Sequence, residues 1–174
     1  MEKTCKLAYS VFLHNISTYK GEARIDHFRG TSQSVLPYLS ENYFDIVYLD
    51  GSHYYDSVLF DIKQAYRLLK DGGIICGDDL ELQADQVDID FARSNVNIDY
   101  IEDPNTGQYF HPGVTMSVND ALGNVSNYFG YWMAKKYNGK IEKTNLNKME
   151  VFIPYHFDES TKADLKSFCH QIGR

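Results

Sequence analysis

Four side chains that can bind a cation or move a proton follow two apolar runs of the sequence. Asp50 comes directly after FDIVYL, and Asp78 and Asp79 follow GGIICG. The ligand crevice of an open α/β sheet lies beyond the carboxyl ends of its strands, so we expect these acids to face one place. His53 is expected on the loop above the first strand, where an imidazole titrating near neutral pH is useful as a general base.

Carboxylates packed this closely either raise one another's pKa or bind a cation, and oxygen ligands suit Mg²⁺ or Ca²⁺ better than zinc. Asp50, Asp78 and Asp79 are therefore candidate metal ligands. A second interpretation stays open, because an Asp at a strand end also caps the following helix or fixes a turn. In the same way, a His after a strand can simply bond to the backbone.

Two further positions are candidates for a substrate pocket. Tyr54 follows His53 directly, and His111 precedes Pro112 at an expected helix start. A proline in the first turn of a helix is also ordinary start chemistry, so His111 has a purely structural interpretation as well.

The elements that must position these residues alternate between short apolar runs and longer amphipathic stretches, which indicates βα units and a parallel sheet. The helix after the first acid is expected to end at Asp71-Gly72-Gly73, where glycine can adopt a left-handed conformation. The predicted elements of this half are a helix over 4–16, a strand over 23–28, a helix from Thr31 or Ser32 to Leu39, a strand over 44–49, a helix over 56–70 and a strand over 74–76.

The second half of the chain predicts an antiparallel hairpin after the parallel core. Asn138-Gly139 separates two strand-like runs, 131–137 and 140–144, and is a strong hairpin signal. The other predicted elements are a helix over 114–125, a strand over 149–155 and a helix over 162–172.

The composition describes one soluble domain over residues 1–174, with a formal charge of −7. The pI of about 5.3 and the lack of a Lys/Arg run argue against a nucleic-acid or anionic-membrane partner. No apolar stretch could span a bilayer or act as a signal peptide, so we expect a cytoplasmic protein. Three scattered cysteines predict free thiols.

The segment FDIVYLDGSHYYDSVLFDIKQAYRLLKDGGIICGDD, from Phe44 to Asp79, resembles class I S-adenosylmethionine-dependent methyltransferases. More narrowly, it resembles the group related to macrolide-sugar O-methyltransferases and cephalosporin-hydroxylase-type proteins. The resemblance implies a Rossmann-like α/β sheet and methyl transfer from S-adenosylmethionine to a hydroxyl of a small-molecule substrate. It further implies that Asp50, Asp78 and Asp79 bind Mg²⁺ and that His53 is the general base.

The chain departs from this family at the cofactor site, because it contains no G-x-G-x-G loop. The contacts that the resemblance still implies for S-adenosylmethionine are Phe28, Gly30, Ser32 and Gly51. About two strands of the family's sheet are missing on the amino-terminal side. We therefore expect a domain that is incomplete there, with an open seam in the sheet that favours a homo-oligomer.

Two alternatives remain. In the first, the chain keeps the methyltransferase fold but neither binds the cofactor nor catalyses a reaction, and the absent glycine loop favours this reading. In the second, the same Asp and His residues form a divalent-metal module or a hydrolase. A chain that binds Mg²⁺ but not S-adenosylmethionine would support the second.

Overall fold

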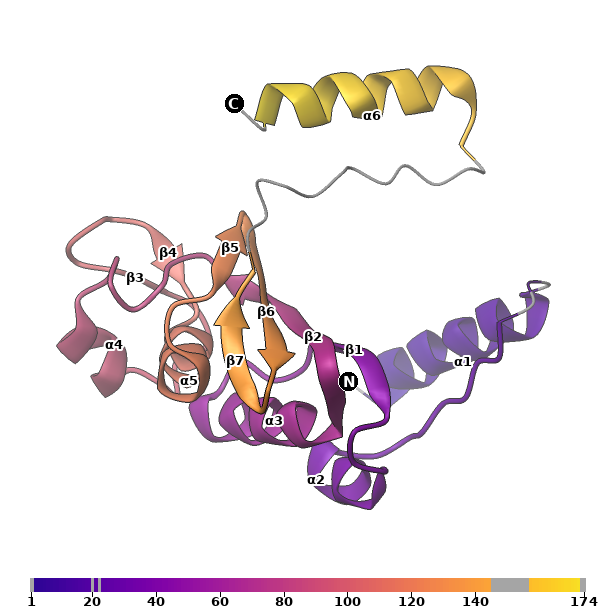
Figure 1. The fold of residues 1–174 in the computed structure, drawn as a ribbon, viewed down its shortest axis with the longest axis horizontal. Helices are drawn as coiled ribbons and strands as arrows, with labels where there is room; N and C mark the ends of the chain where they lie inside the picture. Colours follow the sequence, from indigo (N-terminus) through magenta and orange to yellow (C-terminus); the bar gives the residue numbers. More distant parts are fainter. Residues whose placement is uncertain (1, 20, 22, 145–156, 173–174) are drawn as a thin grey trace. The chain divides into compact units, whose positions relative to one another are not determined.

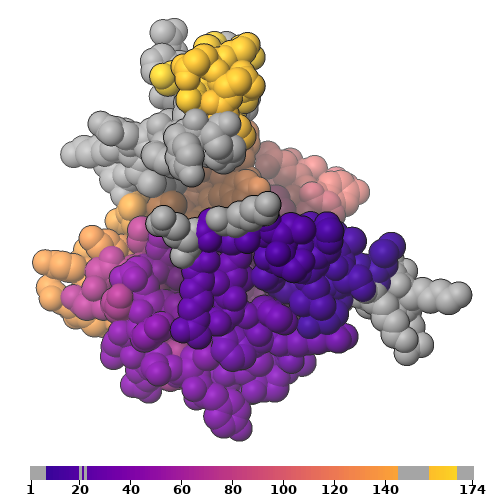
Figure 2. All heavy atoms as spheres, turned by 90° about the vertical axis from the view of Figure 1, so that its right-hand side faces the viewer, coloured from indigo at the N-terminus to yellow at the C-terminus, as the bar shows by residue number. Residues whose placement is uncertain are grey.

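The computed structural model describes residues 2–19, 21, 23–144 and 157–172. The chain divides into two compact units, Met1–Val35 and Leu36–Arg174, and each is described by itself. Figure 2 shows the heavy atoms, with the remaining residues in grey. Among the helices of the described ranges, none combines the length and the apolar composition that a bilayer crossing requires.

The first unit contains two helices, α1 (Glu2–Thr18) and α2 (Ser32–Val35). Thr31 caps α2, because its Oγ1 accepts a hydrogen bond from the Ser34 N–H at 3.3 Å. The strand predicted over 23–28 was wrong, since the described residues there have no regular structure. An extended segment becomes a strand only when a neighbour satisfies its backbone hydrogen bonds, and none of the described residues pairs with this one.

The helix predicted to run to Leu39 is interrupted. After α2 the chain continues as a 3₁₀ turn, η1 (Leu36–Tyr38), which contains Pro37. Proline lacks a backbone N–H and disfavours the α conformation of the residue before it, so a continuous α-helix across this position is not formed.

The second unit is built on a mixed sheet (Figure 1). Strand β1 (Phe44–Leu49) pairs in parallel with β2 (Leu69–Leu80), and α3 (Tyr55–Leu68) connects them. On the other side of β2 lies β6 (Gly130–Tyr137), antiparallel to it. The edge of β6 that faces away from β2 pairs with two strands in turn, β5 (Ser126–Tyr128) and β7 (Lys140–Lys143). A parallel pair followed by an antiparallel hairpin is the predicted arrangement, and it is compatible with a Rossmann-like fold.

The end of α3 was predicted wrongly. The helix stops at Leu68, before the glycines, and Leu69 already pairs with Phe44 of β1. Residues 70–73 then bulge out of the ladder, with Gly72 at φ +85°. The glycine thus serves the bulge in β2 and not the helix end, and β2 is much longer than predicted.

The hairpin between β6 and β7 is confirmed, with Asn138 at φ +49° and Gly139 at φ +67° as a tight turn requires. Helix α5 (Pro112–Leu122) starts and ends earlier than predicted, and α6 (Glu159–Ile172) confirms the closing helix. The strand predicted over 149–155 lies outside the described residues. Four short elements of the described residues were not predicted: α4 (Ile89–Ser94), β3 (Ile101–Glu102), β4 (Tyr109–Phe110) and β5.

The apolar core of this unit lies on one face of the sheet. Helices α3 and α5 pack against each other and against alternate residues of β1, β2 and β6, including Leu49, Ile75 and Trp132. The intervening side chains of the strands point to the other face, where Ile46 and Tyr48 are 61% and 50% exposed. This arrangement fixes α5 close to the carboxyl ends of β1 and β2.

Candidate active site

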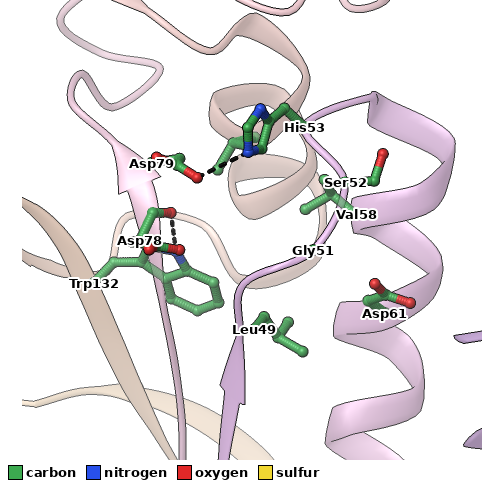
Figure 3. Close-up of a pocket in the computed structure, with 10 residues that line it drawn as sticks. Leu49, Gly51, Ser52, His53, Val58, Asp61, Asp78, Asp79 and Trp132 are labelled. Carbon is green, nitrogen blue, oxygen red and sulfur yellow. Dashed lines mark hydrogen bonds and ion pairs between the residues drawn. The ribbon is translucent and has the colours of Figure 1, made fainter. Parts of the chain in front are cut away.

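A small cleft lies where β1 and β2 end (Figure 3). Gly51 and His53 from the loop after β1 line it, together with Asp78 and Asp79 from the end of β2. The indole of Trp132 closes the side next to Asp78, whose carbonyl oxygen accepts a hydrogen bond from Nε1 at 3.1 Å. The structure therefore brings the loop after one strand and the acids of the next to one place.

The two neighbouring acids of β2 face different surroundings. Successive residues of a strand point to opposite faces, and the pairing of β2 with β6 also shifts between Gly77 and Leu80. Asp79 adopts the left-handed conformation, φ +59°, and its carboxylate reaches His53. Asp78 instead accepts a hydrogen bond from the hydroxyl of Tyr48.

His53 lies between two carboxylates. Its Nδ1 is 2.6 Å from Oδ1 of Asp99, and its Nε2 is 3.0 Å from Oδ2 of Asp79. Burial lowers the pKa of His53, but the hydrogen bond to Asp99 and the charges of Asp79, Asp99 and Asp78 act the other way, and the pKa is raised above its usual value of 6.5. Asp99 thus fixes Nδ1 as the donor, and Nε2 is the ring nitrogen that meets Asp79.

Asp79 is also perturbed. Burial and the neighbouring charge of Asp78 raise its pKa above 3.8, while His111 and His53 act in the opposite direction. A hydrogen bond between Asp79 and His53 requires a proton on one of the two groups. The pair therefore holds one exchangeable proton at the mouth of the cleft.

His111 comes to the same place from the start of α5. Its ring lies edge-on to that of His53 at a centroid distance of 4.5 Å, and its Nδ1 is 3.1 Å from both carboxylate oxygens of Glu81. This approach depends on Gly113, since a Cβ there would lie 2.2 Å from the carbonyl oxygen of His53. His111 is the N-cap of α5, as the helix-start interpretation expected, and its role in a substrate pocket stays a prediction.

His53, Asp79 and His111 form a group that could hold a metal ion, because one ligand atom from each lies within 4.8 Å of the others. Asp50 and Asp78 are outside this group. In the part of the chain that the structure describes, the three predicted ligands Asp50, Asp78 and Asp79 do not converge in this way.

Asp50 and Asp78 act on Tyr48 instead. Partial burial and the hydrogen bond to Asp78 raise the pKa of Tyr48 to about 12, and the charges of Asp78, Asp50 and Tyr131 add to this effect. The charge of Asp78 also helps to raise the pKa of His53.

The other predicted residues are spread more widely. Tyr54 is the N-cap of α3 without a side-chain capping bond and is 48% exposed. Phe28, Gly30 and Ser32 belong to the first unit, where Phe28 is 68% exposed and Ser32 begins α2. Their predicted contacts with S-adenosylmethionine remain predictions.

Sequence reasoning missed the two carboxylates that hold the histidines. Glu81 lies two positions after Asp79, and an acid-rich run after a strand was a signal that could have included it. Asp99 lies 46 positions from His53, in a loop with no local motif, so only the tertiary structure could reveal it.

Comparison with known proteins finds one family. Residues 9–80 match a family model described as a methyltransferase domain. Neither the curated proteins nor the solved structures yielded a match. The matched range covers less than half of the chain but contains β1, α3, β2 and every predicted site residue except His111, including Asp50, His53, Asp78 and Asp79. The match supports a methyltransferase family for the segment that carries this site.

Proposed function

We propose that this chain transfers a methyl group from S-adenosylmethionine to a hydroxyl oxygen of a small molecule, with His53 as the general base. The observation that carries the proposal is that the methyltransferase match includes the ends of both strands that line the cleft. The methyltransferase match ends at residue 80, and the strand whose acids reach His53 ends at Leu80. The matched segment thus holds both strand ends of the candidate site.

The local geometry supports His53 in this role. Asp99 orients the ring through Nδ1, so Nε2, which meets Asp79 in the cleft, is the nitrogen that can accept a proton when the shared proton lies on Asp79. S-adenosylmethionine supplies a methyl group on a positively charged sulfur. When the hydroxyl oxygen bonds to this carbon, the carbon–sulfur bond breaks, and Nε2 of His53 accepts the hydroxyl proton.

Mg²⁺ assistance has less support. Magnesium prefers an all-oxygen ligand set in near-octahedral geometry. The group that the structure brings together offers two imidazole nitrogens and one carboxylate, so it does not fit Mg²⁺. No step of the proposed reaction therefore passes through this ion, and its binding to Asp50, Asp78 and Asp79 stays a prediction.

The test is calorimetric titration of S-adenosylmethionine into the full chain, with and without Mg²⁺, followed by assay of S-adenosylhomocysteine release with a panel of hydroxyl compounds. We expect micromolar binding. His53→Gln should keep this binding and lose turnover at least tenfold, while the exposed His14→Gln, a matched control, should behave like the parent. Absence of binding in both conditions would overturn the proposal and favour a methyltransferase fold without cofactor binding.

A further inference from the structure

Each histidine of the site is held by its own carboxylate. His53 directs Nδ1 at Asp99, and His111 directs Nδ1 at Glu81. Histidines that bind metals typically donate their second ring nitrogen to a carboxylate in this way, which fixes the ring and its tautomer. The same arrangement occurs twice here, on residues from different loops, and assigns Nε2 of both rings as the available ligand atom.

One ring nitrogen of each histidine lies near the carboxylate of Asp79. Nε2 of His53 is 3.0 Å from Oδ2 of Asp79, and a ligand atom of His111 lies within 4.8 Å of both. Two ligands at about 2 Å from a tetrahedral ion are roughly 3.3 Å apart. Small side-chain rotations are therefore sufficient to place all three on one ion.

The surroundings favour a cation. Besides Asp79, the carboxylates of Asp99, Glu81 and Asp78 face this group, against two imidazoles. The side chains of His53 and Asp79 are each 30% exposed and that of His111 is 11% exposed, so an ion can enter from one side. An ion there would replace the proton that His53 and Asp79 share.

We propose that His53, Asp79 and His111 bind a divalent transition-metal ion, with Asp99 and Glu81 as positioning residues. Two nitrogens and one carboxylate oxygen suit Zn²⁺, Co²⁺, Mn²⁺ or Fe²⁺, and three ligands leave open positions for water or substrate. The proposal does not depend on methyl transfer. The metal proposal nevertheless has a consequence for methyl transfer. A metal on Nε2 prevents His53 from accepting a proton, so the bound ion inhibits the proposed reaction.

The test uses the full chain after removal of metals with a chelator. Co²⁺ is added while its visible ligand-field absorption is followed, and Zn²⁺ and Mg²⁺ are then compared as competitors. We expect saturable Co²⁺ binding with the intense bands of a low-coordinate site, displacement by Zn²⁺, and no displacement by a similar concentration of Mg²⁺.

Three variants locate the ion. His111→Gln should weaken Co²⁺ binding at least tenfold, and His14→Gln should leave it unchanged. Glu81→Gln should weaken it about tenfold, as loss of an orienting carboxylate does, without removing a ligand. Circular dichroism shows whether each variant is folded. If His111→Gln does not fold, Glu81→Gln still tests the proposal.

The contrary results are equally specific. Unchanged Co²⁺ binding in both His111→Gln and Glu81→Gln would overturn the proposal. So would loss of binding in Asp50→Asn and Asp78→Asn together with retention in His111→Gln, since the ion would then belong to the carboxylates alone. Titration of S-adenosylmethionine into the metal-free chain is independent of these results, so failure of the metal site and failure of the proposed function are distinguishable.

Discussion

The carboxylate of Asp120 in α5 connects three helices, because it binds Tyr55 of α3 and Arg93 of α4. Tyr55 donates to Oδ2 at 2.8 Å, and the guanidinium of Arg93 donates to both oxygens. The hydrogen bonds from Arg93 lower the pKa of Asp120, burial opposes them, and Tyr55 lowers it further, to about 2. Because α5 also carries His111 at its start, this contact helps to fix the helix that reaches the site.

Asp120→Asn should reduce the free energy of unfolding at pH 7 by about 1 kcal/mol, a value discounted for the half-exposed Arg93. The lowered pKa means that the charge stabilises the fold above its ordinary pKa of 3.8, and that this contribution is lost as pH falls through about 2. Denaturant unfolding at pH 7 and pH 2 measures both effects. The difference between parent and variant should shrink at pH 2, and the exposed Asp164→Asn should show none at either pH.

Gly113 is the residue that allows His111 to approach His53. A Cβ at this position would lie 2.7 Å from the backbone nitrogen of Tyr55 and 2.7 Å from the carbonyl oxygen of Val96, both rigid backbone atoms. Gly113→Ala should therefore cost about 2 kcal/mol of stability, measured by thermal unfolding. Gly51→Ala is the matched control, because its Cβ would meet only Oδ2 of Asp61, at 3.6 Å. Equal effects of the two changes would contradict this account.

At the residue scale, the sequence identified the chemistry of the site but not its grouping. Asp79, His53 and His111 were all candidates, and the structure places them together. Asp50 was predicted with them because it follows the same strand as His53. Its charge instead helps to raise the pKa of Tyr48. For Asp78 and Asp79, the face that each acid takes depends on the register of β2 with β6, which changes between Gly77 and Leu80 and is set by the partner strand.

At the element scale, Lys136 connects three segments from inside the fold. This buried side chain of β6 donates to Oδ1 of Asn42 and to the carbonyl oxygens of Tyr66 and Leu69. Lys136 thereby satisfies carbonyl oxygens at the end of α3 and at the start of β2, where the helix ends without a glycine. Its charge also lies 4.6 Å from the ring centroid of Tyr66.

Lys136→Met should lower the free energy of unfolding by about 3 kcal/mol, because two part-buried acceptors and the buried carbonyl of Leu69 lose their donor while the apolar stem is kept. Lys135→Met on the same strand removes an exposed charge and should change stability by less than about 0.5 kcal/mol. Denaturant titration of the two variants under one condition gives the comparison. A loss for Lys136→Met no larger than that for Lys135→Met would show that the acceptors find other partners.

Elements with strong local signals were predicted well, and elements defined by their neighbours were not. FDIVYL and the Asn138-Gly139 hairpin are local patterns, and both formed as expected. The stretch over 23–28 has strand-like composition but no partner among the described residues. The end of α3 was misplaced because pairing of Leu69 with Phe44 outweighed the preference of a helix for a glycine end.

At the scale of the whole molecule, one face and one edge of the sheet are uncovered within residues 36–144. Strand β1 pairs with β2 on one side, and among these residues no strand pairs with its other side. On the face opposite α3 and α5, Ile46, Tyr48 and Tyr131 are 61%, 50% and 60% exposed. Parallel strands are normally buried on both faces, and a free edge beside an apolar surface favours association.

We therefore expect the chain to self-associate at micromolar concentrations, as measured by sedimentation velocity. Ile46→Lys places a charge on the uncovered face, in the edge strand β1. It should shift the population towards the monomer. The fold should be kept, because this side chain is already 61% exposed. Phe129→Lys is the control, since Phe129 is 78% exposed but lies in the turn between β5 and β6, at the far edge of the sheet. A monomeric parent chain, or equal dispersal by both substitutions, would show that this face is not the one that associates.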